Sequence, residues 1–129
     1  MKRITLLLML LATVAHAQAT STTLTWTATG DDGRIGTATS YTMRYAATAP
    51  GADTLAWFTG ATNVPGLPAP TVAGTTQSVT VTPAGGFAAG SWHFILIAYD
   101  DAGNKSPWSN VLVRTFGDVI PPGVITDLR

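Results

Sequence analysis

The sequence contains no cysteine and no glutamate, and histidine occurs only twice. The absence of cysteine excludes disulfide bonds and thiolate nucleophiles, so the hydrophobic core must hold the fold by itself. With no glutamate, and with His93 as the one histidine outside the leader described below, few general acids or bases remain. Charged residues make up only 11% of the chain, and no cluster of lysine and arginine suggests a nucleic-acid-binding face.

The N-terminus has the three-part layout of a secretory signal peptide. Lys2-Arg3 is followed by the apolar run Ile4–Val14 and by the small-residue triplet Ala15-His16-Ala17. We expect cleavage after Ala17, with a second small-x-small site two residues later. A membrane anchor would need roughly 18–20 apolar residues, which is longer than this run. Residues 1–17 are therefore predicted to be a signal peptide, and the mature protein to be secreted, extracellular or periplasmic, without membrane association.

The remaining chain is the size of one ordinary domain. We assign residues 18–117 to that domain and residues 118–129 to a linker and the start of a further module. The composition, with 13 glycines, 8 prolines and abundant threonine, indicates β-strands separated by turns.

Alternation of apolar and polar residues predicts short strands, and no segment shows a sustained helical period. The expected strands are 22–29, 41–45, 55–59, 76–82, 91–99 and 109–116. The segment 91–99 is apolar on both faces, with Trp92, Phe94, Leu96 and Ala98 on one and His93, Ile95, Ile97 and Tyr99 on the other. We predict an all-β sandwich with Greek-key connections.

Three quoted stretches carry a family resemblance: LTWTATGDDGRIGTATSYTMRYA, PGLPAPTVAGTTQSVTVT and FILIAYDDAGNKSPWSNVLVRT. In this order they resemble the second and third strands, the approach to the fifth, and the sixth and seventh strands of the fibronectin type III module, in its bacterial secreted form. The resemblance covers about residues 22–116. It implies an immunoglobulin-like sandwich of two antiparallel sheets.

The chain departs from that family pattern in two places. Only Gln18–Ser21 precede the second strand, so the first edge strand is expected to be short or missing. Trp92 stands where the family has a corner tyrosine, and its indole can donate a hydrogen bond but has no hydroxyl. The stretch PPGVITDL, residues 121–128, is similar to the opening of another module. The alternative is that this tail supplies the missing edge strand to its own domain, against the direction that the family topology predicts.

Carboxylate pairs are the first candidates for chemistry. Asp31 and Asp32 lie between Gly30 and Gly33, a composition typical of a turn. Calcium would need roughly six to eight oxygen ligands, and adjacent carboxylates at a strand end point apart and do not flank a substrate bond. The stretch from Asp100 to Asn104 is expected to be a tight hairpin, and His93 an outward-facing strand residue. We expect no catalytic, metal-binding or cofactor-binding residue.

Two surfaces are candidates for binding. Trp57 and Phe58 are a candidate aromatic shelf for stacking on a sugar, unless they only cover the core. A candidate interaction surface consists of Ile95, Ile97, Tyr99 and Leu112, which should face outward if Trp92 and its alternate residues fill the core. The alternative is that long side chains such as Arg44 and Arg114 lie over this surface.

These observations predict a non-catalytic secreted spacer or adhesion module that makes protein or surface contacts within a modular extracellular protein. The alternative is an accessory domain of an extracellular hydrolase, with carbohydrate binding as a further variant. Expected partners are neighbouring domains of a longer chain and a protein or polysaccharide, with no nucleic acid, membrane or cofactor.

Overall fold

The computed structural model describes residues 21–117, 122–126 and 129. The predicted signal peptide, and with it any test of cleavage after Ala17, lies outside these residues, as does much of the tail. The described part contains six strands and one helix: β1 (Thr22–Thr27), β2 (Ser40–Ala46), α1 (Thr54–Gly60), β3 (Thr62–Asn63), β4 (Thr76–Val81), β5 (Gly90–Tyr99) and β6 (Leu112–Phe116).

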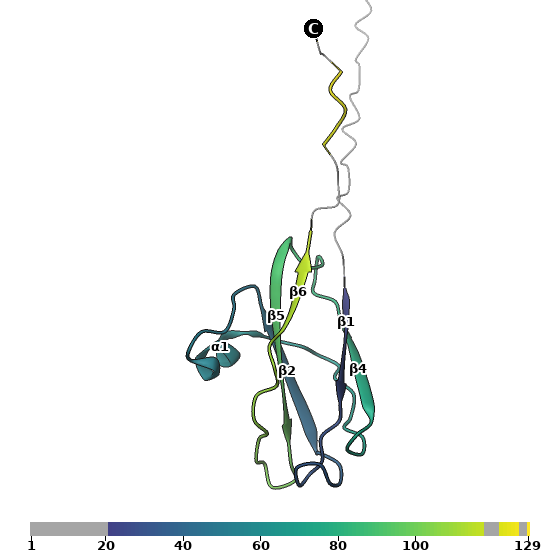
Figure 1. Ribbon diagram of the computed structural model, residues 1–129, viewed down its shortest axis with the longest axis vertical. Helices are drawn as coiled ribbons and strands as arrows, with labels where there is room; N and C mark the ends of the chain where they lie inside the picture. Colours follow the sequence, from purple (N-terminus) through teal and green to yellow (C-terminus); the bar gives the residue numbers. More distant parts are fainter. Residues whose placement is uncertain (1–20, 118–121, 127–128) are drawn as a thin grey trace, which may run out of the picture.

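The strands form two antiparallel sheets. One sheet has the order β1-β4 and the other the order β3-β2-β5-β6. Figure 1 shows the two sheets facing each other, with α1 on the outer side of the four-stranded sheet. The prediction of a mostly β architecture with two antiparallel sheets is confirmed, and the arrangement is consistent with an all-β sandwich.

The main core lies between the sheets because alternate residues of each strand turn inward. Along β4 every second residue is buried, from Gln77 through Val79 to Val81. The buried members of the core are Leu24, Met43, Tyr45, Val64, Val79, Val81, Phe87 and Phe94, with Trp26, Leu67, Trp92, Leu96, Leu112 and Phe116 packed against them. The predicted inward face of the 91–99 strand is thus confirmed at Trp92, Phe94, Leu96 and Ala98.

Aromatic rings make up much of this core. Phe87 stacks on Phe116 with ring centroids 4.4 Å apart and meets the rings of Trp92 at 5.3 Å and Tyr45 at 5.8 Å. The Trp92 indole donates a 2.9 Å hydrogen bond to the carbonyl of Ala88, four residues upstream. The indole at this position therefore does bond back to the preceding backbone.

Among the residues that the structure describes, Gln77 is the buried polar side chain, and it makes three hydrogen bonds. The amide oxygen of Gln77 accepts hydrogen bonds from the Tyr41 hydroxyl (2.8 Å) and the Thr71 N–H (3.3 Å), and its amide nitrogen donates to the Ala69 carbonyl (2.7 Å). Gln77 thereby fastens the proline-rich connection before β4 to the sheet. Since each of its bonds replaces one with water, burial costs little here.

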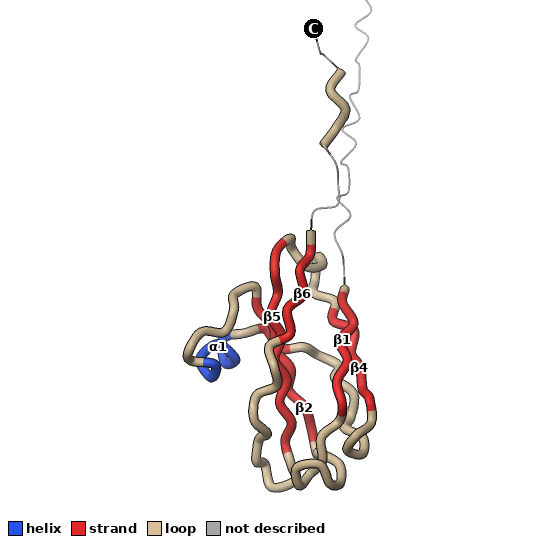
Figure 2. The backbone as a smooth tube through the Cα atoms, in the orientation of Figure 1, coloured by secondary structure: helices blue, strands red, loops and turns tan. Residues whose placement is uncertain are grey.

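The segment between β5 and β6 is not a regular strand, as Figure 2 shows by its tan colour. Here two serine hydroxyls accept hydrogen bonds from β5: Ser106 from the Ala98 N–H (3.0 Å) and Ser109 from the Leu96 N–H (2.9 Å). Each hydroxyl donates onward to the carbonyl of the next residue. The serine hydroxyls therefore accept hydrogen bonds from β5 N–H groups that the carbonyls of a neighbouring strand would accept in a regular ladder. We call residues 106–110 the serine segment.

In the described part no strand precedes β1, which pairs with β4 alone. Figure 1 shows β1 beginning and β6 ending at the same pole of the domain. The course of the chain before residue 21 lies outside the described residues.

Candidate functional site

Residues 55–59, predicted to be a strand, form a helix instead. Asp53 caps α1, its carboxylate accepting a 2.9 Å hydrogen bond from the Ala56 N–H, and the Thr59 hydroxyl bonds back to the Leu55 carbonyl at 2.8 Å. Capping satisfies backbone donors that a helix start leaves open. This local chemistry and the packing described next override the β-propensity of Trp57 and Phe58.

The predicted sugar shelf is not formed. Trp57 is half-buried and its indole donates a 2.8 Å hydrogen bond to the carbonyl of Thr48. Phe58 is only 6% exposed and faces the four-stranded sheet. As neighbours on a helix, the two rings point in directions roughly 100° apart and cannot present one flat surface. The hypothesis of stacking a sugar on this pair is therefore wrong.

The expected interaction surface on β5 is covered. Ile95 and Ile97 are 1% and 3% exposed and form a second hydrophobic cluster with Phe58, against which Trp57, Tyr99 and Trp108 pack. The prediction that these isoleucines face outward from the inner core is correct in direction, but they are not at the surface. Helix α1 and Trp108 in the loop before β6 cover them. We use the name outer-face cluster for Phe58, Ile95 and Ile97 together with Trp57, Tyr99 and Trp108.

Leu112 does not belong with these residues. The register of β5 and β6 pairs Leu112 with Phe94, and directly opposed residues share a face, so Leu112 packs against the inner core. The predicted surface of Ile95, Ile97, Tyr99 and Leu112 is therefore divided between two sides of one sheet. Only Tyr99 of the four lies half-buried at the margin of the outer-face cluster.

Arg44 joins the helix to the sheet. Its guanidinium donates to the carbonyls of Thr59 at 2.9 Å and Ala61 at 3.3 Å, and lies 5.4 Å from the centre of the Phe58 ring. Carbonyls at a helix C-terminus carry partial negative charge, so a cation there is favourable. The alternative that Arg44 lies over apolar residues of this face is correct for Phe58. Its hydrogen bonds are to the carbonyls at the end of α1.

The carboxylate pair at residues 31 and 32 lies in a tight loop. Asp32 bridges to Ile35 through backbone hydrogen bonds of 3.2 Å in both directions. A Cβ added to Gly30 would collide with the backbone of Ile35, so the loop requires glycine there. The carboxylate of Asp31 accepts a 3.2 Å hydrogen bond from the Asp101 N–H, which ties this loop to the β5 turn. These contacts favour a structural role.

Asp100 organises the turn that follows β5. Its carboxylate accepts hydrogen bonds of 2.7 Å from both the backbone and the side-chain amide of Asn104, and Gly103 has a φ of 83°. The side-chain bond from Asn104, followed in effect by backbone N–H groups, lowers the pKa of Asp100 below its ordinary value. The turn expected between Asp100 and Asn104 is present, although the regular strand β6 begins only at Leu112.

No group of three or more histidine, aspartate or other acidic residues that could hold a metal occurs among residues 21–117, 122–126 and 129. His93 is half-buried on β5, and within the described part its Nδ1 is buried without a hydrogen-bond partner. It lies opposite Ala46 on β2 and Val113 on β6, neither of which offers chemistry.

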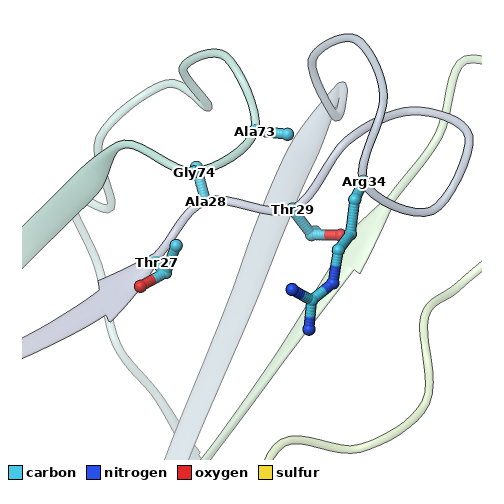
Figure 3. A pocket seen from close by; sticks show the side chains of 6 residues that line it. All are labelled: Thr27, Ala28, Thr29, Arg34, Ala73 and Gly74. Carbon is cyan, nitrogen blue, oxygen red and sulfur yellow. The ribbon is translucent and has the colours of Figure 1, made fainter.

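A pocket of about 530 Å³ lies at the end of β1 (Figure 3). It is lined by Thr27, Ala28, Thr29, Arg34, Ala73 and Gly74, and backbone hydrogen bonds join Ala28 to residues 74 and 75 beside it. Figure 3 shows the Arg34 side chain extending past Thr29. A single exposed guanidinium among small side chains gives this pocket no nucleophile and no base.

Two further hollows open on the side of the domain where β1 lacks a second partner. They measure about 350 Å³ and 110 Å³ and share Thr25 and Trp26 of β1, Leu96 of β5, and residues 109 and 110 of the serine segment. Sequence reasoning missed them, although the expectation of a short or missing first strand was a signal that this side of the two-stranded sheet would be open.

Comparisons with protein-family models, with curated proteins and with solved structures found no match to this chain. Within the residues that the structure describes, no helix is long and apolar enough to cross a membrane. The class that the structure defines is thus a small domain of two antiparallel sheets with one short helix on the outer face of the larger sheet.

Proposed function

We propose that this chain is a non-catalytic contact module of the fibronectin type III kind, secreted as part of a modular extracellular protein. The strand pairing supports this assignment. In an immunoglobulin-like sandwich the second strand lies beside the fifth, and the third, sixth and seventh lie together. The pairs β1-β4, β2-β5 and β5-β6 agree with that order once the first strand is taken as missing.

The observation that supports a contact function is the open side of the two-stranded sheet. There β1 pairs with β4 alone, and hollows of about 350 Å³ and 110 Å³ lie between β1, β5 and the serine segment. Such an open side is available to a partner.

The test uses the absence of native cysteine. Gly117→Cys provides a single thiol through which the exported chain is coupled to beads in one orientation. We expect these beads to be retained on cells or secreted material of the producing organism above beads that carry an unrelated β-domain. Equal retention would contradict a contact function.

The non-catalytic part is tested separately. The purified chain is assayed for release of products from polysaccharide and peptide substrates, and no turnover is expected. Turnover that is lost in Asp31→Asn would overturn this part of the proposal and favour the hydrolase alternative.

A further inference from the structure

The free edge of β1 is open to strand pairing. The backbone N–H and C=O of Ala28 bond toward residues 74 and 75, on the side of β4. Because these groups alternate in direction along a strand, those of Thr23, Thr25 and Thr27 point to the free side. Residues 21–29 include no charged residue and no proline, which are the usual means of protecting an edge against pairing.

Behind this edge the inner core is accessible. The smaller of the two hollows described above is walled by Leu24, Met43 and Phe94, which belong to the main core. Trp26 lines both hollows, and its indole N–H is buried with no acceptor among the described residues. The open side therefore offers backbone donors and acceptors together with apolar surface.

The chain carries a segment of matching chemistry in its tail. Val124 and Ile125 are 86% and 76% exposed, and residues 122–126 belong to no strand or helix. In the sequence GVITDL, residues 123–128, Val124, Thr126 and Leu128 fall on one face of an extended chain and Ile125 and Asp127 on the other. The segment has no proline, and its six residues match the 6 residues of β1.

We propose that the β1 edge binds residues 123–128 of a second copy of this chain as an added strand, with Val124 and Leu128 turned into the hollows. This inference rests on the proposed contact function and names the partner of the contact. Strand addition of this kind gains affinity from backbone hydrogen bonds and specificity from alternate side chains.

A second copy is favoured over the chain's own tail. Val124 and Ile125 remain exposed in the single chain. A tail that returned to its own β1 would have to turn back soon after β6, and the sequence before it contains Pro121 and Pro122, each of which disfavours a helical turn at the residue preceding it. A tail from another copy has no such restriction. Since each copy carries one edge and one tail, reciprocal exchange closes a dimer and one-way exchange forms a growing series.

The experiment is analytical ultracentrifugation of the exported full chain and its full-length variants over a wide concentration range. The wild-type mass is expected to rise with concentration above that of the processed monomer. Val124→Lys places a charge in the hollow and should weaken association about tenfold or more, since tenfold needs only about 1.4 kcal/mol. Ile125→Lys is the matched control, because it changes an equally exposed neighbour on the outward face and should leave association within about threefold.

The edge is tested by Thr25→Pro, which removes one outward N–H and leaves the β1-β4 bonds in place, with Thr115→Pro on the edge of β6 as its control. Circular dichroism establishes whether each variant is folded. If Thr25→Pro does not fold, a peptide of residues 120–129 is titrated onto the Val124→Lys chain, and binding must fail for the same peptide with its backbone N-methylated.

A wild-type chain that stays monomeric at all concentrations overturns the inference. Association that Val124→Lys leaves unchanged also overturns it, and indicates direct edge-to-edge pairing. If beads that carry the Val124→Lys chain are still retained on cells, the contact function is supported, but a second copy of the chain is not the partner.

Discussion

The substitution Phe58→Ala tests whether α1 covers the outer face of the four-stranded sheet. Phe58 lies over Ile95 and Ile97, 4.9 Å from the ring of Trp108 by centroid distance and 5.4 Å from the Arg44 guanidinium. Removing the ring leaves a cavity beside both isoleucines, which lose their packing contacts with Phe58. The expected result is a loss of stability with retention of the main core.

The magnitude follows from the burial of the ring. Truncating a buried phenylalanine to alanine typically costs about 3–5 kcal/mol, including the cavity left behind. We expect the lower end, about 3 kcal/mol, because α1 lies on the outside of the sheet and can settle inward. For a domain of this size each kcal/mol shifts Tm by about 4–8 °C, so Tm should fall by about 12–24 °C.

The measurement is equilibrium urea unfolding followed by tryptophan fluorescence and circular dichroism. Leu55→Ala is the control, since Leu55 lies in the same helix but is 56% exposed, and its loss should change the free energy of unfolding by less than about 0.5 kcal/mol. If Phe58→Ala and Leu55→Ala cost the same within error, α1 does not cover this face and the reasoning fails.

Three further outcomes are expected. Gly30→Ala should destabilise the domain, because the added Cβ collides with backbone, whereas Gly60→Ala in the open end of α1 should stabilise it by up to about 1 kcal/mol; thermal unfolding compares the two. Gln77→Leu should cost about 1 kcal/mol in urea unfolding, since the buried Gln77 amide loses its bonds to Tyr41, Thr71 and Ala69, and a neutral result would show that these bonds do not stabilise the domain. The carboxyl pKa of Asp100 is lowered on folding, so its stabilisation is full above the ordinary value and is lost as pH falls through the lowered pKa; Asn104→Ala should raise that pKa in an NMR titration and reduce this acid dependence.

The strands of the two sheets could be predicted from sequence because apolar and polar residues alternate where one face of a strand packs on the core and the other faces solvent. Along β1 and β4 buried and exposed positions follow that alternation closely. On β5, apolar residues on both faces left open whether the outer face meets a partner or is covered by long side chains, and periodicity could not say what the outer layer is. That layer includes a helix of 7 residues, about two turns, which is too short to show a helical period.

The candidate surfaces failed for a different physical reason. The face that Leu112 occupies depends on its register with Phe94, which is set by the length and bonding of the irregular segment before β6. Local patterns contain no such information. The open edge of β1 agrees, within the described residues, with the expectation that the first edge strand is short or missing. The hollows behind it arise from the three-dimensional arrangement of both sheets.

The serine segment makes one boundary of the domain depend on chemistry that a backbone ladder does not need. A carbonyl oxygen is present whatever residue stands in a strand, so ordinary ladders tolerate substitution. Where the hydroxyls of Ser106 and Ser109 take the place of carbonyls, the loss of a single oxygen atom at either position unpairs an amide of β5. This margin of the fold therefore depends on which residues stand at positions 106 and 109, whether or not either serine touches a ligand.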